Sequence, residues 1–243
     1  MNFKKAKLLS HKNLVDDVIE LQFEPLEPFN FKAGQFVTIN IPNEENKLLM
    51  RSYSISSAPT QASNTFQLCI KIVEGGLGSH FLSNLEVGSE IEFLGPAGVF
   101  TIKKQETPNQ PNSLLFIATG TGLSPLKSMI EDELINKRNT QKIHLIFGLR
   151  YIKNIFYKEH LEDLKQRFPN FTYTIALSQP EDPSWAENGG YVGRVTNFLN
   201  ELELDPIKAE TYACGLKPMI DETTRILQEK GLPKEAIHFE KFD

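Results

Sequence analysis

The spacing of apolar residues changes part-way along the chain, and this change constrains the fold more than any other feature. In the first hundred residues, short alternating runs are separated by Gly, Pro and Asn; they are VIELQFEP, GQFVTINIP, SYSIS, TFQLCIKIV and SEIEFLGP. Short strands at this spacing are typical of an antiparallel barrel or sandwich. Among them, GSHFLSNL at residues 78–85 predicts one short helix.

After residue 113 the pattern becomes an alternation of strands and helices. Strand-like runs (LLFIAT, KIHLIFGL, FTYTIAL, TYACG, AIHFEKF) alternate with helical ones (LSPLKSMIEDELINKR, YKEHLEDLKQRF, PMIDETTRILQEKG). This alternation predicts an α/β domain built on a parallel sheet. The polar segment KKQETPNQPNS separates the two halves, so we predict domains at residues 1–103 and 114–243, joined by a linker at 104–113.

Composition and charge exclude several classes of function. A net charge of −5 argues against a nucleic-acid surface. No apolar run is long enough to cross a bilayer, and no apolar signal region follows the basic residues at the start, so we expect a cytoplasmic protein without a membrane segment. The two cysteines, Cys69 and Cys214, cannot ligate an iron-sulfur cluster, and the five histidines show no metal-ligand spacing, so no metal site is expected.

The stretch MRSYSISSAP at residues 50–59 reads as a strand that carries unusually polar side chains. By the two-residue period of a strand, Arg51 and Tyr53 share one face, while Ser52 and Ser54 share the other. A strand that only filled a core would place large aliphatic side chains on one of these faces. The pattern therefore indicates a polar ligand.

The most informative local motif is FIATGTGLSPLKSMI at residues 116–130. An apolar strand meets the turn Thr119, Gly120, Thr121 and Gly122, and a helix follows with Pro125 in its first turn, where a missing N–H has no cost. Free backbone N–H groups and the helix dipole at such a turn suit a pyrophosphate. The alternative interpretation is a plain strand-to-helix turn.

A second glycine cluster, VEGGLGSHFL at residues 73–82, follows a strand in the N-terminal half. Gly76, Leu77, Gly78 and Ser79 could present N–H groups to another phosphate, although a hairpin turn would have the same composition. Arg51 on a neighbouring strand favours the phosphate interpretation, because a guanidinium offers a forked pair of donors. Two phosphate-binding turns in two domains imply two nucleotides.

These motifs together resemble the ferredoxin-NADP reductase family of flavoenzymes. The segments RSYS, IKIVEGGLGS, GPAGVF, ATGTGLSP, IFGLR, YACGLKPM and FEKFD occur in that family's order and at roughly its spacing, over essentially the whole chain. The resemblance implies two domains: an N-terminal antiparallel β-barrel that binds FAD, and an α/β domain with a parallel sheet that binds NADPH or NADH.

The resemblance also implies roles for residues of the first domain. Arg51 would pair with the FAD pyrophosphate, Tyr53 would stack on the isoalloxazine ring, and the Ser54 hydroxyl would lie near flavin N5. The remaining expected contacts to FAD come from Ser52, from Ile70, Lys71 and Ile72 beside the ribitol, and from Gly76, Leu77, Gly78 and Ser79 around the pyrophosphate.

In the second domain, the turn Thr119 to Gly122 with Pro125 would receive the pyrophosphate of the nicotinamide nucleotide. Cys214 and Gly215 would approach the nicotinamide, and Glu240 and Phe242 match the family's C-terminal Glu-x-aromatic pattern. Two of these residues have an alternative structural interpretation. Cys214 could be a small buried hydrophobic residue, as a lone cysteine often is, and Phe242 could be a core residue. The resemblance thus implies Ser54, Cys214 and Glu240 as the catalytic residues.

Two positions depart from the family's pattern. Members that select NADPH usually have Ser-Arg after the third strand of this domain, whereas this chain has Ser178 and Gln179, and glutamine cannot neutralise a phosphate. Arg150 and Arg194 stand where some relatives hold the 2′-phosphate, so both nucleotides remain open, with a lean toward NADH. The second departure is that Asp243 follows Phe242.

The implied activity is hydride transfer from NAD(P)H to flavin N5, followed by transfer of single electrons to a separate carrier. Ferredoxin, flavodoxin or an oxygenase component is the expected partner, and we expect a monomer. A free-flavin reductase is the alternative, although such relatives generally lack a glycine-serine cap like that at residues 76–79. A nucleotide-binding regulatory module without turnover is a third possibility.

Overall fold

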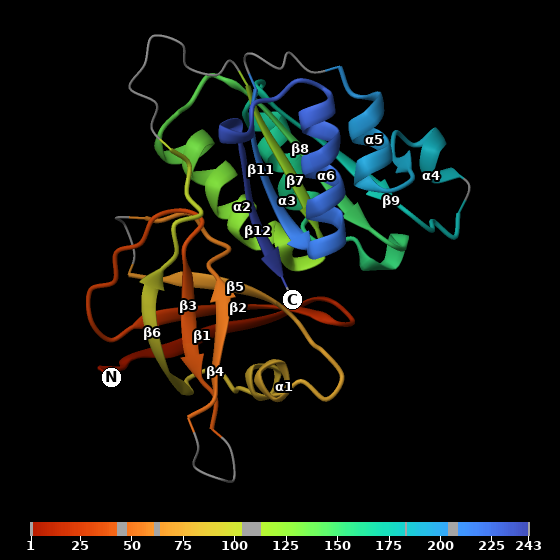
Figure 1. Cartoon of the computed structure of the whole chain (residues 1–243). Helices are drawn as coiled ribbons and strands as arrows, with labels where there is room; N and C mark the ends of the chain where they lie inside the picture. The colour runs from red at the N-terminus through yellow and green to blue at the C-terminus, as the bar shows by residue number, and fades with distance from the viewer. Residues whose placement is uncertain are drawn as a thin grey trace. The chain divides into compact units, whose positions relative to one another are not determined.

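A computed structural model describes residues 2–42, 48–60, 64–103, 113–182, 184–203 and 209–242 (Figure 1). The chain divides into two compact units. The first contains the residues up to Ile102 together with Lys127–Lys137, and the second contains Lys103–Leu126 and the chain from Arg138 onward. Most of the predicted linker at 104–113 lies outside the described residues, so that boundary stays a prediction.

The first unit is an antiparallel sheet closed into a barrel. Its described residues form six strands in the order β4-β3-β6-β1-β2-β5, with antiparallel pairing between neighbours. A further antiparallel bridge joins Ile55, just after β4, to Leu68 of β5, so the two edge strands of the sheet meet. The strands are β1 (Lys4–Val15), β2 (Val18–Pro25), β3 (Phe36–Asn40), β4 (Met50–Ser54), β5 (Phe66–Lys71) and β6 (Glu90–Ala97).

Aromatic packing forms the core of this barrel. Phe29 lies edge-on to Phe93 with 5.3 Å between ring centroids, and Phe66 contacts Phe23, Phe29 and Phe93 at 5.4–5.5 Å. The predicted short helix is present as α1 (Leu77–Ser83). Strand β1 was not predicted, because its basic residues hide the alternation that buries Ala6 and Leu8.

The second unit is an α/β fold with a parallel sheet, as predicted. Its strands are β7 (Ser113–Thr119), β8 (Lys142–Leu149), β9 (Phe171–Leu177), β10 (Tyr191–Val192), β11 (Ala209–Leu216) and β12 (Ile237–Phe242). They lie in the order β10-β9-β8-β7-β11-β12, and the recorded pairs are parallel. The direction of winding therefore reverses between β7 and β11, and ligands of open parallel sheets bind at such a switch point.

Helices connect these strands. They are α2 (Leu123–Glu131), α3 (Lys158–Arg167), α4 (Ser184–Glu187), α5 (Val195–Glu201) and α6 (Lys217–Glu229). A 3-10 turn, η1 (Gly120–Gly122), precedes α2, and a π-helical turn, η2 (Asp132–Asn136), follows it. The sequence predicted α2, α3 and α6 but not α4, β10 or α5, which are short and carry little periodic signal.

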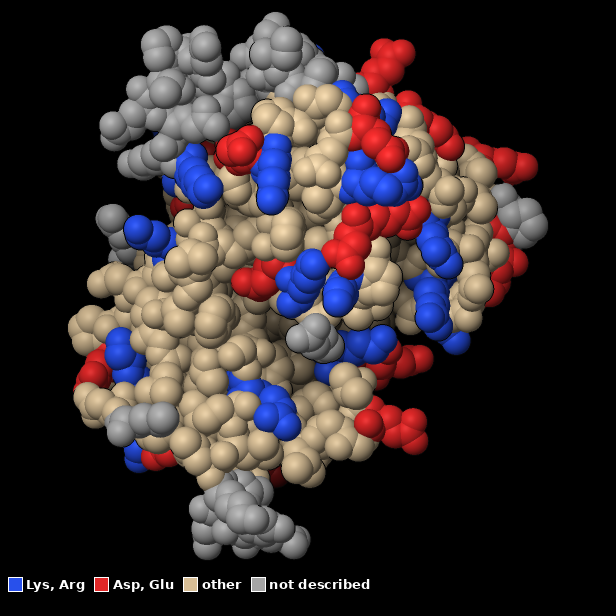
Figure 2. Space-filling view, in the orientation of Figure 1, with Lys and Arg blue, Asp and Glu red and all other residues tan. Residues whose placement is uncertain are grey.

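The surface carries charges of both signs. On the face drawn in Figure 2, Lys and Arg side chains are interspersed with Asp and Glu side chains. Among the described residues, each helix is too short or too polar to span a bilayer.

Candidate functional site

In the first unit, the strand with the R-x-Y-S motif lies directly against the glycine turn. A Cβ atom added to Gly78 would lie 2.7 Å from the Tyr53 hydroxyl and 2.9 Å from Arg51 Cγ. Only a glycine lets the backbone approach these two side chains so closely. The structure therefore brings together two motifs that are about 25 residues apart in the chain.

Arg51 and Tyr53 have different environments on β4. Arg51 is exposed, and its Nη1 donates to the carbonyl of Met50 at 2.9 Å. Within the described part of the chain, this bond uses one of the five guanidinium N–H donors. Tyr53 packs partly against the barrel core. Burial raises the pKa of its hydroxyl to about 12, although the positive charge of Arg51 acts to lower that pKa. Tyr53 is thus a neutral phenol. The other N–H groups of the Arg51 guanidinium can donate to an anion.

The two serines of β4 also differ. The Ser52 hydroxyl shares a 3.0 Å hydrogen bond with Thr38 on β3 and is exposed. Ser54 ends the strand, pairs in register with Phe36, and is only 9% exposed. Of the two, Ser54 has the more restricted hydroxyl, which suits a fixed directional hydrogen bond.

The turn before α1 is held by Ser79. Its hydroxyl accepts from the backbone N–H of Val73 at 3.0 Å and donates to the carbonyl of Gly76 at 3.1 Å. This hydroxyl therefore organises the turn from within. The N–H groups of Leu77 and Gly78, in the first turn of α1, have no intrahelical acceptor, and no acidic residue lies there to repel an anion.

The predicted ribitol residues lead into this turn from β5. Ile70 is buried and pairs with Ile19, while the N–H of Ile72 donates to the carbonyl of Asp17 at 2.8 Å. Lys71 is exposed and forms an ion pair with Asp17 at 3.4 Å. These contacts fix the backbone of the segment but leave its role toward FAD a prediction.

In the second unit, two turns pack backbone to backbone at the carboxyl ends of β7 and β11. A Cβ on Gly122 would overlap the carbonyl oxygen of Cys214 and lie 2.9 Å from the Gly215 nitrogen. Gly215 has φ of +153°, and its own missing Cβ makes room for the Thr119 hydroxyl. The two predicted nucleotide motifs thus meet at the switch point of the sheet.

This cradle has features that suit a dinucleotide phosphate. Thr119 Oγ1 is buried and has no hydrogen-bond partner among the described residues. The 3-10 turn contains two glycines and no charged residue, and α2 has no acidic residue in its first turn, where Pro125 lies. A buried hydroxyl without a partner, next to bare backbone at a helix start, fits a bound pyrophosphate.

Cys214, Glu240 and Phe242 lie together on neighbouring strands. Cys214 pairs in register with Glu240, and Leu216 pairs with Phe242. Burial raises the pKa of the Cys214 thiol well above its usual range, and the charge of Glu240 raises it further. Cys214 is therefore a protonated thiol and not a thiolate nucleophile.

The residues predicted near the 2′-phosphate, Arg150, Ser178 and Arg194, also come from neighbouring segments, as does Gln179. The N–H of Gln179 donates to the carbonyl of Arg150 at 2.9 Å, and the N–H of Ser178 donates to that of Leu149 at 3.1 Å. Arg194 precedes α5, directly after Gly193, whose N–H donates to the carbonyl of Leu177 at 2.8 Å. Arg150, Ser178, Gln179 and Arg194 therefore cluster at the carboxyl ends of β8 and β9.

Sequence reasoning singled out no residue of the segment 127–136. Lys127 and Glu131 are nevertheless buried beside the residues that follow β4. The sequence carries no signal of this burial, because opposite charges at i, i+4 spacing are typical of a solvent-exposed helix face.

Comparisons with known proteins agree with this geometry. Residues 5–102 match the family model of the oxidoreductase FAD-binding domain, and residues 116–225 match that of the oxidoreductase NAD-binding domain. The chain is 36% identical over 248 residues to ferredoxin--NADP reductase B of Sorangium cellulosum, covering 98% of this chain and 97% of that protein. This chain belongs to the ferredoxin-NADP reductase family. It is thus an oxidoreductase with an FAD-binding and a NAD-binding domain.

Some other proteins similar to this chain are longer. The chain is 31% identical over 94% of its length to the reductase component of propane 2-monooxygenase from Rhodococcus jostii, of which it spans 60%. The crystal structure of a ferredoxin NADP+ reductase from Neisseria gonorrhoeae with bound FAD and NADP has the same fold, with a TM-score of 0.83, 21% identity and 99% coverage of both chains.

The close approach at Gly122 gives a direct test of the second cradle. We expect Gly122→Ala to weaken binding of NADPH and NADH about tenfold, because overpacking typically costs about 1–3 kcal/mol. Calorimetric titration with each nucleotide measures this loss. Gly88→Ala is the matched control, since it adds a methyl group to a turn of the first unit outside both candidate sites, where only Lys7 lies within 4 Å, and it should leave the affinity for NADPH and NADH unchanged. A Gly122→Ala chain with wild-type affinity would contradict the role of this turn.

Proposed function

We propose that this chain is an FAD-containing reductase that oxidises NADPH or NADH by hydride transfer to flavin N5 and passes single electrons to a separate protein carrier. One observation carries the proposal. In each unit, a bare glycine turn suited to a pyrophosphate lies against the residues expected to hold a ring, Tyr53 in the first and Cys214 in the second. Bound FAD would supply the chemistry that converts a two-electron hydride transfer into two single-electron transfers.

The residues of β4 would bind and orient this cofactor. Arg51 would pair with the pyrophosphate through its remaining donors, together with the N–H groups of Leu77 and Gly78. Tyr53 would offer a neutral aromatic face to the isoalloxazine ring. The buried Ser54 hydroxyl would form a hydrogen bond at N5 and so fix the edge that receives the hydride.

The residues of β11 and β12 would position the nicotinamide. The uncharged thiol of Cys214 would exclude water beside the ring without reacting with it, and the Glu240 carboxylate would hold the ring's polar edge. Phe242 would cover the flavin face until the nicotinamide displaces it. None of these groups needs to abstract a proton, because the reaction moves a hydride.

The electron acceptor would be another protein. The chain contains two cysteines, which is too few for a cysteine-ligated iron-sulfur cluster within it. One relative is a ferredoxin--NADP reductase and another is the reductase component of a monooxygenase. Ferredoxin, flavodoxin or an oxygenase component is therefore the class of acceptor that we propose.

Reduction of bound flavin tests this function. The purified chain, loaded with FAD and passed through gel filtration, should stay yellow, and NADPH or NADH added without oxygen should bleach it. Ferredoxin added next should be reduced by one electron per molecule. A colourless chain that reduces added riboflavin would instead be a free-flavin reductase. A yellow chain that neither nucleotide bleaches would be a regulatory module.

The role of Ser54 predicts a specific kinetic defect. Ser54→Ala should slow flavin reduction about a hundredfold while leaving FAD bound, as expected for loss of one positioned donor. Stopped-flow absorbance measures the rate, and fluorescence titration measures FAD affinity. Ser10→Ala, which removes an exposed hydroxyl of β1, is the control. Wild-type reduction rates in Ser54→Ala would remove this residue from the mechanism.

Nucleotide preference depends on the charge next to Arg150. Gln179→Arg should raise the ratio of kcat/KM for NADPH to that for NADH about tenfold, because a guanidinium neutralises the 2′-phosphate. Steady-state kinetics with both nucleotides measures the ratio. Gln228→Arg adds the same charge on an exposed position of α6 and should not change it. An unaltered ratio in Gln179→Arg would mean that this position does not contact the phosphate.

A further inference from the structure

The segment Ser56–Pro59 follows β4 after one residue, Ile55, and lies where the barrel closes. Ile55 forms the bridge to Leu68, the N–H of Ser56 donates to the carbonyl of Gln67 at 2.8 Å, and the Ser57 hydroxyl accepts from the N–H of Gln67 at 3.1 Å. Any shift of this segment therefore moves the end of β4, where Tyr53 and Ser54 lie.

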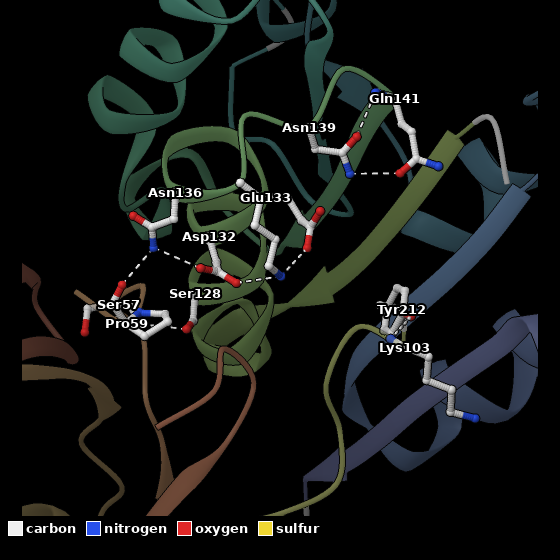
Figure 3. Close-up of polar contacts among 11 residues, drawn as sticks. Ser57, Pro59, Lys103, Ser128, Asp132, Glu133, Asn136, Asn139, Gln141 and Tyr212 are labelled. Atoms are coloured by element: carbon white, nitrogen blue, oxygen red, sulfur yellow. Dashed lines mark hydrogen bonds and ion pairs between the residues drawn. The ribbon is translucent and has the colours of Figure 1, made fainter. Parts of the chain in front are cut away.

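Each residue from Ser56 to Pro59 is bound by a side chain of the segment Lys127–Asn136, which belongs to the same unit. Figure 3 shows two of these contacts, those of Ser57 and Pro59. The four hydrogen bonds are Lys127 Nζ to the Ser56 carbonyl at 3.2 Å, Ser128 Oγ to the Ser57 carbonyl at 2.6 Å, the Ala58 N–H to Glu131 Oε2 at 3.1 Å, and Asn136 Nδ2 to the Pro59 carbonyl at 2.7 Å. We name this set of contacts the β4 clamp.

A buried ion pair lies at the centre of the β4 clamp. Lys127 Nζ is 2.8 Å from Glu131 Oε1, and the two side chains are 5% and 9% exposed. Burying two charges costs desolvation energy that their mutual attraction often only balances, so fold stability alone gives little reason for the pair. Its members instead bind a carbonyl and an N–H of Ser56–Pro59.

The π-helical turn η2 explains how Asn136 joins the same face. In an α-helix, the eight residue-to-residue steps from Ser128 to Asn136 would rotate the side chain by about 80° away from that face. The wider i to i+5 turn, marked by the N–H of Lys137 donating to the Asp132 carbonyl at 2.9 Å, reduces this rotation. Asp132 then fixes the Asn136 amide through a 2.9 Å hydrogen bond (Figure 3). Lys137 in turn forms an ion pair with Asp132 at 2.7 Å.

The apolar side of the segment packs on the barrel as well. Met129 is fully buried, and its methyl group occupies the place where a Cβ of Gly34 would lie. The segment is therefore held on two sides, which makes it a rigid support for the residues it binds.

We propose that Lys127, Ser128, Glu131 and Asn136 are positioning residues that hold Ser56–Pro59, and through it Tyr53 and Ser54, in the geometry needed at the flavin. The flavin part of this inference rests on the proposed function. The clamp acts through backbone groups, so its loss changes the placement of Ser54 without removing any group that touches FAD.

Two variants test the β4 clamp. Lys127→Met with Glu131→Gln removes both charges of the buried pair together and keeps an acceptor for the Ala58 N–H. Ser128→Ala removes one hydrogen bond and favours the helix. Flavin reduction should slow about tenfold or more, because small misplacements near a reacting atom carry such costs, and the visible spectrum of bound FAD should shift. FAD should remain bound.

Matched controls separate positioning from general loss of stability. Arg167→Met with Asp163→Asn removes an exposed i, i+4 ion pair of α3, and Thr224→Ala removes a helix hydroxyl of α6 that donates to the Ile220 carbonyl. Both controls should keep the wild-type rate and spectrum. If the double variant does not fold, Ser128→Ala and Asn136→Ala decide the question.

Amide hydrogen exchange provides a readout that does not need FAD. In the flavin-free chain, the Ser56 and Ala58 amides should exchange faster in the clamp variants than in the wild type or the controls. Wild-type exchange in the variants would overturn the clamp itself. If these amides exchange faster in the variants while the rate of flavin reduction and the flavin spectrum stay unchanged, the proposed role of the clamp at the flavin is wrong. A wild-type chain that does not take up FAD would refute the proposed function and the flavin part together, while exchange would still decide the clamp.

Discussion

The absence of a β-carbon at three glycines is the constraint on which both candidate sites depend. Gly78 lets the turn before α1 contact Arg51 and Tyr53, and Gly122 and Gly215 let the turns after β7 and β11 contact each other. Any side chain at these positions would separate the backbone proposed to bind an anion from the residues proposed to face a ring. The chemistry of each unit therefore follows from a packing requirement, not from a cluster of reactive side chains.

Environment then assigns different tasks to residues that look alike in the sequence. Ser52 bonds Thr38 at the surface, Ser54 is buried at the end of β4, and the Ser79 hydroxyl closes its own turn. Cys214 is kept protonated by burial, which suits a residue that shapes a site without reacting. These differences depend on neighbours in space and are not visible in the motif itself.

The sequence predicted much of the fold because hydrophobic periodicity is strong where strands are buried. The apolar runs of β7, β8 and β9 and the alternation of β2 and β5 all appear as strands. The pattern could not reveal β1, whose outward face is rich in lysine, or the two-residue β10. The site motifs were predictable as motifs, but the contact of Gly78 with Tyr53 and that of Gly122 with Cys214 required coordinates.

The segment Lys127–Lys137, which begins within α2, shows the limit of such sequence analysis most clearly. Lys127, Ser128, Glu131 and Asn136 have the composition of a solvated helix face, yet Lys127, Ser128 and Glu131 are buried. No local pattern indicates that residues 127–137 group with the N-terminal unit, because their partners are backbone groups of Ser56–Pro59. A polar residue in an amphipathic helix can face solvent, or it can be buried and donate a hydrogen bond to a distant loop. Only its contacts in the structure distinguish these two cases.

The central claim is that each glycine turn holds one nucleotide. Hydrogen–deuterium exchange of the chain with FAD alone and with NADP+ alone tests it most directly. The account predicts that FAD protects the amides of Leu77 and Gly78 and leaves those of Gly120 and Gly122 unchanged, and that NADP+ does the reverse. Protection of neither turn, or of the same turn by both ligands, would contradict it.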